Sequence, residues 1–112
     1  DIQQTAAAIG CLKEGDDLVA SLKAKVQTIT SMAAGRQRRR VACIQWADPL
    51  YAAGAWVPQL IYLAGGEDVL SGPSTSGDTS LSDDRLLSAR PEVILFALCG
   101  MDINTSQPEA KQ

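Results

Sequence analysis

The fold of this chain is decided by residues 40–66, which read RVACIQWADPLYAAGAWVPQLIYLAGG. The apolar run 41–46 contains Val, Cys and Ile, a composition typical of a strand that is buried on both faces. A proline then stops the strand, and Pro58 falls where the first turn of a helix tolerates a residue without an N–H group. Gly65 and Gly66 can adopt the left-handed conformation that often ends a helix. The segment therefore predicts a strand, a loop and a helix.

Two amphipathic helices are predicted before this segment. Apolar residues recur at helical spacing from Ile2 to Glu14, and Gly15 is expected to end the first helix. Asp16 is a suitable N-cap for the second helix. The apolar stripe of the second helix advances in steps of three and four residues and consists of Leu18, Leu22, Val26, Ile29 and Met32. The two helices together make a helical arm, which we assign to residues 1–36.

The rest of the chain alternates short elements with loops. Residues 67–70 read as a short strand, and the turn-forming run 71–80 predicts a surface loop in preference to a phosphate-binding loop, because no strand-loop-helix context surrounds it. Ser82 is a suitable cap for a short helix, which is followed by a strand over 92–98. The polar tail 106–112 is expected to fray.

This order of elements predicts an α/β fold. Strands 41–46 and 92–98 are expected to be parallel in one small, mostly parallel sheet with flanking helices, which is a Rossmann-like lobe preceded by the N-terminal helical arm. At 112 residues the chain has room for one core. We assign the α/β lobe to residues 37–112.

Composition excludes several classes of protein. The net charge of -3 argues against nucleic acid as a partner, and no apolar run approaches the roughly 20 residues that span a bilayer. The one basic cluster, Arg36 with residues 38–40, is interpreted as a link at a helix end, with an anion site as the alternative. The first residues lack the basic start and apolar segment of a signal peptide. Either a leader has been removed or the chain is a piece of a longer protein.

Histidine is absent, and three cysteines are widely spaced. These facts exclude His-based acid–base chemistry and the usual metal-ligand spacings, so we predict no metal site and no cofactor. Cys43 is expected to pack as a small hydrophobic residue, whereas Cys99 follows a strand and is the one thiol considered for function. Asp48 and Asp102 leave a small enzyme that uses cleft carboxylates as the alternative to a non-catalytic protein.

Three stretches resemble one family. They are WADPLYAAGAWVPQLIYLAGG at 46–66, LSDDRLLSARPEVI at 81–94 and ALCGMD at 97–102. All three are similar to the second lobe of the periplasmic substrate-binding proteins that serve cobalamin and iron-chelate ABC importers. The resemblance implies a periplasmic or extracytoplasmic substrate-binding component without catalysis, whose ligand is a corrinoid such as cobalamin, an iron siderophore or haem.

The resemblance also implies partners and departures. The partner would be the ABC transporter permease, but Gln59 stands where many relatives carry a carboxylate on the docking surface, which weakens this expectation. In the family the second helix would join two lobes, and here the first lobe and the last elements of the second are missing. Half a cleft leaves apolar surface bare, so we expect a homodimer. The alternative is a self-associating structural fragment or an orphan ligand-binding fragment that has lost transport function.

The ligand site is expected beyond the carboxyl ends of the two strands, where open α/β sheets bind their ligands. Trp46 and Trp56 would provide flat apolar surfaces and N–H donors for a corrin or porphyrin-like ring, with packing in the core as the alternative interpretation. The resemblance implies ligand contacts at Trp46, Asp48, Pro49, Tyr51, Gly54, Trp56, Cys99, Gly100 and Asp102.

Overall fold

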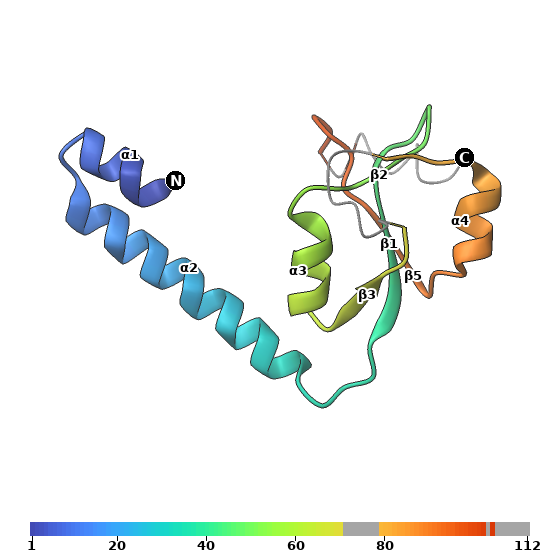
Figure 1. The fold of residues 1–112 in the computed structure, drawn as a ribbon, viewed down its shortest axis with the longest axis horizontal. Coiled ribbons are helices and arrows are strands. Elements are labelled where there is room, and N and C mark those ends of the chain that lie inside the picture. Colours follow the sequence, from blue (N-terminus) through green and yellow to red (C-terminus); the bar gives the residue numbers. More distant parts are fainter. Residues whose placement is uncertain (71–78, 103, 105–112) are drawn as a thin grey trace. The chain divides into compact units, whose positions relative to one another are not determined.

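The computed structural model describes residues 1–70, 79–102 and 104, and it divides into two compact units, Asp1–Ala34 and Gly35–Gln112 (Figure 1). The first unit is helical, and the second combines strands and helices, which confirms the predicted α/β class. The elements in order are α1 (Ile2–Ala8), α2 (Leu12–Ala33), β1 (Arg39–Trp46), β2 (Tyr51–Ala52), α3 (Val57–Leu63), β3 (Gly66–Asp68), β4 (Thr79–Ser80), α4 (Asp83–Ala89) and β5 (Val93–Phe96).

The boundary between the two N-terminal helices differs from the prediction. Helix α1 already ends at Ala8, and Gly10 makes the turn with a φ of 78°. Gly15 does not end a helix but lies buried inside α2, where a β-carbon on it would collide with the side chain of Ala6. The glycine is therefore required for close packing of α1 on α2. A glycine that permits such an approach looks the same in sequence as one that ends a helix.

The apolar stripe of α2 is exposed along its whole length, from Leu18 to Met32. The helix is amphipathic in pattern, but packing against α1 covers a different part of it, around Gly15. None of the helices in the described part of the chain combines the length and apolar character needed to cross a lipid bilayer.

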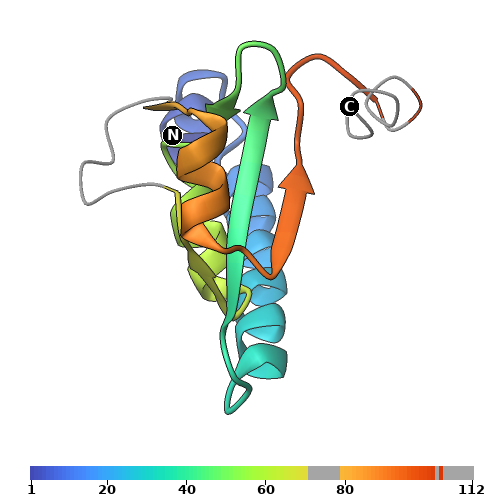
Figure 2. The same cartoon turned by 90° about the vertical axis from the view of Figure 1, so that its right-hand side faces the viewer.

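Strand β1 is the centre of the sheet. It runs parallel to β5, with Val41 opposite Val93, and parallel to β3 along its first residues. The predicted parallel pairing of the two long strands is thereby confirmed, and Figure 2 shows their arrowheads pointing the same way. Antiparallel strand β2 pairs with the end of β1, and β4 pairs with β2, so the sheet is mixed.

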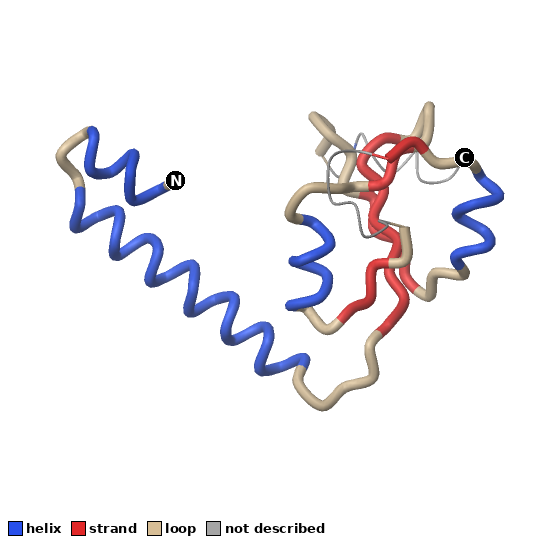
Figure 3. Tube along the Cα trace, in the orientation of Figure 1, coloured by secondary structure: helices blue, strands red, loops and turns tan. Residues whose placement is uncertain are grey.

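Strands β2 and β4 were not predicted, because each is only two residues long. Such short strands have no periodic pattern, and their backbone partners determine them. Strand β4 falls within the run predicted as a loop, and residues 71–78 of that run lie outside the described residues, as does the tail 106–112. Figure 3 shows the strands, drawn in red, between helices α3 and α4.

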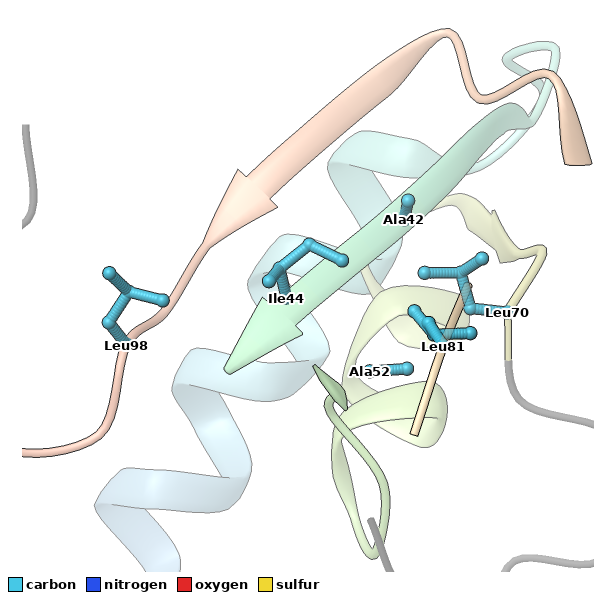
Figure 4. Close-up of a cluster of buried hydrophobic side chains, with 6 residues drawn as sticks. All are labelled: Ala42, Ile44, Ala52, Leu70, Leu81 and Leu98. Atoms are coloured by element: carbon cyan, nitrogen blue, oxygen red, sulfur yellow. The ribbon is translucent and has the colours of Figure 1, made fainter. Parts of the chain in front are cut away.

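Successive residues of β1 enter cores on opposite faces of the sheet, as the alternation of side chains along a strand requires. Ala42 and Ile44 belong to the cluster shown in Figure 4, whose other members are Ala52, Leu70, Leu81 and Leu98. Val41 and Cys43 point to the other face, where they pack with Ala53 and Ile61. Residues of α4 cover the first cluster and residues of α3 cover the second. Both faces of β1 are therefore buried, as its continuous apolar run predicts.

The basic cluster secures helix ends. Arg38 Nη1 donates to the carbonyl oxygens of Tyr62 (2.8 Å) and Gly66 (2.9 Å), and Arg40 Nη2 donates to the carbonyl oxygen of Ala89 (2.7 Å). These carbonyls lie at or just beyond the C-terminal ends of α3 and α4, where a cation opposes the negative end of the helix dipole. The helix-end interpretation is confirmed for these two arginines, although the helices concerned are α3 and α4, not the arm.

Candidate functional site

Three chain segments meet at the carboxyl end of β1. The strand ends at Trp46, and the chain returns through a turn to β2, where Tyr51 is the partner of Trp46 in the sheet. Beyond β5 the chain stays attached to β1, because the backbone N–H of Cys99 donates to the carbonyl oxygen of Gln45 (3.1 Å). The topology therefore brings the predicted strand-end residues of both long strands to one edge of the sheet.

Two hollows open at this edge, and Trp46 lines both of them. The larger hollow has a volume of about 340 Å³ and is lined by Gln45, Trp46, Tyr51 and Cys99. The smaller hollow has a volume of about 120 Å³ and is lined by Trp46, Ala47, Asp48, Leu98 and Met101. The volume of the larger hollow is at the lower end of the range for small-molecule sites.

The orientation of the Trp46 ring is set from within the chain. Its Nε1–H donates to the carbonyl oxygen of Asp48 (2.9 Å), and 43% of the residue remains exposed. The donor that the sequence seemed to offer to a ligand is therefore already engaged. What the indole presents to the hollows is apolar ring surface, which suits stacking against another flat ring.

The other predicted residues of the two loops lie around this edge. Asp48 and Pro49 are exposed in the turn between β1 and β2, and Asp48 lines the smaller hollow. Gly100 has a φ of 73° in the turn after β5, a conformation that favours glycine. Asp102 is exposed further along the same loop, and its Oδ1 accepts a hydrogen bond from the backbone N–H of Asn104 (3.0 Å).

Gly54 and Trp56 lie on the segment that leads from β2 into α3. Gly54 is buried, and the positive φ of this segment, 52°, falls on Ala55. Trp56 is the N-cap residue of α3, is 70% exposed and is not among the residues that line the two hollows. The structure thus groups Trp46 with Tyr51, Asp48 and Cys99 in the linings of the two hollows, and Trp56 lines neither of them.

Sequence reasoning did not name four of the lining residues, which are Gln45, Ala47, Leu98 and Met101. Gln45 and Leu98 belong to segments predicted as strands, and Ala47 has no chemistry that marks it. Met101 stands in the quoted ALCGMD stretch between two residues that were named. Its thioether adapts readily to a flat ligand, and this property was the available signal.

The thiols and carboxylates of the lobe differ in their exposure to solvent. Burial, with a further contribution from the charge of Asp68, raises the pKa of the Cys43 thiol, which lies inside the sheet. Cys99 is a free and exposed thiol. Asp48 and Asp102 are both exposed, so neither has the desolvated surroundings that favour acid–base catalysis. Within the described ranges, no cluster of three or more His, Cys, Asp or Glu side chains is arranged to hold a metal ion.

The whole sequence matches a known protein family. The family described as periplasmic binding protein matches residues 1–112. Among curated protein sequences, none matches this chain.

Several solved structures share the fold. An ABC transporter substrate-binding protein from Listeria monocytogenes aligns with a TM-score of 0.82 and 22% identity over 98% of this chain and 43% of that chain. S. aureus IsdE complexed with heme aligns with a TM-score of 0.79 and 24% identity over 99% of this chain and 45% of that chain. The vitamin B12 binding protein BtuF of Vibrio cholerae aligns with a TM-score of 0.64 and 19% identity over 96% of this chain and 46% of that chain. The chain therefore spans less than half of the length of each of these proteins.

Proposed function

The chain belongs to the periplasmic binding protein family, and we propose that it is the substrate-binding part of an ABC importer. Its ligand is a corrinoid such as cobalamin or an iron chelate of the siderophore or haem type, which it captures outside the cytoplasmic membrane without chemical change. The binding surface is the edge of the sheet formed by the two hollows around Trp46.

The observation that supports this proposal is the position of Trp46. Its ring lines two adjoining hollows at once, is partly exposed and has its N–H group engaged with Asp48. A ring held in this way is ready to stack on a flat ligand without first losing conformational freedom. Tyr51 and Met101 extend the surface on its two sides with adaptable contacts.

The comparisons support the class of ligand. The S. aureus relative is complexed with heme, and the V. cholerae relative binds vitamin B12. Both ligands are large rings around a metal ion, so their recognition depends on stacking surfaces more than on a single polar contact. Docking to a permease would use the surface near the start of α3, where the exposed Gln59 weakens the contact compared with a carboxylate.

The test is a binding titration with matched tryptophan variants. Cobalamin, haemin and a ferric hydroxamate siderophore are titrated against the protein by equilibrium dialysis, and tryptophan quenching is recorded in parallel. Trp46→Ala should weaken binding by about tenfold, the size of one lost stacking contact. Trp56→Ala is the control and should leave the affinity unchanged. Failure of all three ligands to bind, or equal loss in both variants, would contradict the proposal.

A second candidate, self-association, is favoured by the exposure of β5. Its residues Val93–Phe96 are all apolar and exposed, and an uncovered apolar edge strand readily pairs with another chain. Light scattering on the same preparations separates the two candidates. A dimer that Leu95→Lys dissociates, in a protein that binds none of the three ligands, would support the structural role in place of ligand capture.

A further inference from the structure

Few basic residues follow the basic cluster (Arg36 and residues 38–40) in the sequence. After Arg40, the basic residues of the sequence are Arg85, Arg90 and Lys111. Arg85 is engaged by its Nη2 donating to the carbonyl oxygen of Leu70 (2.7 Å), and Arg90 is the C-cap residue of α4. Lys111 lies outside the described residues.

The arginines of the basic cluster are far from the two hollows. Arg39 and Trp46 are the first and last residues of β1, so a rise of about 3.3 Å per residue separates them by about 23 Å along the strand. That separation exceeds twice the Debye length of about 8 Å at physiological salt, so these charges are screened from a ligand at the other end. Arg38 and Arg40 are, moreover, already bonded to helix carbonyls.

The lining of the hollows is neutral or negative. Among the described residues that line them, Asp48 is the one ionisable acid, and no Lys or Arg is present. A ligand with several carboxylates would lose part of its hydration on this surface, gain no cationic partner and meet a like charge. A ligand whose side chains end in amides carries no charge on them. It would therefore need no cationic partner and would not be repelled by Asp48.

We infer that this surface selects ring-shaped or chelate ligands that are neutral or cationic and disfavours those that carry several carboxylates. The inference rests on the proposed function and narrows it, because it favours amide-bearing corrinoids and uncharged ferric chelates over carboxylate-bearing porphyrins. Asp48 is the residue of the described lining that sets the preference.

The experiment compares two ligands with the same ring and different charge. Dicyanocobinamide has amide side chains on its corrin ring, whereas dicyanocobyrinic acid has carboxylates on the same ring. Equilibrium dialysis against the full chain at low and high salt gives both dissociation constants. The amide ligand should bind more tightly at low salt, by up to about fivefold, the size of an exposed like-charge contact, and the ratio should shrink at high salt.

Two variants identify the source of the preference. Asp48→Asn should lower the ratio of the amide-ligand affinity to the acid affinity, because it removes the like charge that the acid meets. Glu67→Gln removes one negative charge at the other end of β1, where Glu67 lies opposite Arg40, and this control should leave the ratio as it is. Equal affinity for the two ligands, or tighter binding of the acid, would overturn the charge selection while leaving the proposed function in place. Absence of binding by both ligands and by cobalamin, haemin and the siderophore would overturn the proposed function as well.

Discussion

Strands β1 and β5 are both apolar, but only one of them is buried. Val41 to Ile44 of β1 are between 0% and 7% exposed, whereas Val93 to Phe96 of β5 are between 38% and 46% exposed. Both runs have the composition of a strand buried on two faces, and sequence alone predicts the same burial for each. In these two strands, composition predicts that the segment forms a strand, while its place in the sheet determines how much of it is covered.

The two strands differ in burial because they have different numbers of neighbouring strands. β1 has β5 along one edge, β2 and β3 along the other, and a core on each face. Among the described strands, β5 pairs with β1 alone. Its outer backbone groups and both rows of side chains are therefore open to solvent, an arrangement that natural proteins usually avoid at a sheet edge.

The largest effect should come from shortening the same residue type in the two strands. Ile44→Ala removes a fully buried side chain of β1, and we expect it to lower the free energy of unfolding by about 2–4 kcal/mol. Ile94→Ala is the matched change in β5, where nearly half of the residue is already in solvent, and it should cost less than about 1 kcal/mol. Urea unfolding followed by tryptophan fluorescence measures both. Equal losses would show that β5 is covered in solution.

A second comparison uses the thiol of Cys43 inside β1 and the thiol of Cys99, three residues beyond the end of β5. In a Cys11→Ser background, Cys99 should react rapidly with a disulfide reagent, whereas Cys43 should react more than about a hundredfold more slowly, because it must wait for the sheet to open. The protection should disappear in denaturant. Similar rates for the two thiols in the folded protein would contradict the placement of Cys43 in the core.

The pH dependence of Cys43 follows from its raised pKa. Burial favours the neutral thiol in the folded state, so this contribution to stability is complete below the pKa of the unfolded chain. It is lost as the pH rises through the folded pKa, above the ordinary value of 9.0. Cys43→Ala should therefore flatten the alkaline part of the stability profile.

The smallest effect concerns the ion pair that joins the starts of the two strands. Glu92 precedes β5, and its Oε2 accepts a hydrogen bond from the backbone N–H of Arg40 (2.9 Å) while its Oε1 lies 2.6 Å from Arg39 Nη1. These hydrogen bonds, the backbone bond first, lower the pKa of Glu92. The stabilisation is therefore present above the ordinary value of 4.5 and is lost as the pH falls through the folded pKa.

Glu92→Gln should thus lower the unfolding midpoint slightly at neutral pH and have no effect in acid. Glu67→Gln is the control, because Glu67 lies 3.6 Å from Arg40 Nη1 in an exposed pair and its carboxylate accepts no backbone hydrogen bond from the described residues. A difference between the wild type and Glu92→Gln that persists unchanged in acid would show that charge is not the cause.

Most of the helices and the pairing of the two longest strands could be predicted from the sequence. Pro58 in the first turn of α3 and Ser82 as the cap of α4 both stand where predicted, since their backbone and hydrogen-bonding preferences act within a few residues. The parallel pairing of β1 with β5 followed from the helical connection between them. The break at Gly15 and the two-residue strands β2 and β4 were missed, because distant partners determine them.

The candidate site divides in the same way. The ends of the apolar strands near Trp46 and Cys99 could be predicted from the sequence, because strand composition and proline or glycine breaks are local properties. The fold was needed to show that Trp46 lines two hollows, that its N–H group is engaged with Asp48 and that Trp56 lines neither hollow. The two indoles have identical chemistry, and what distinguishes them is the set of segments that the sheet brings beside each one.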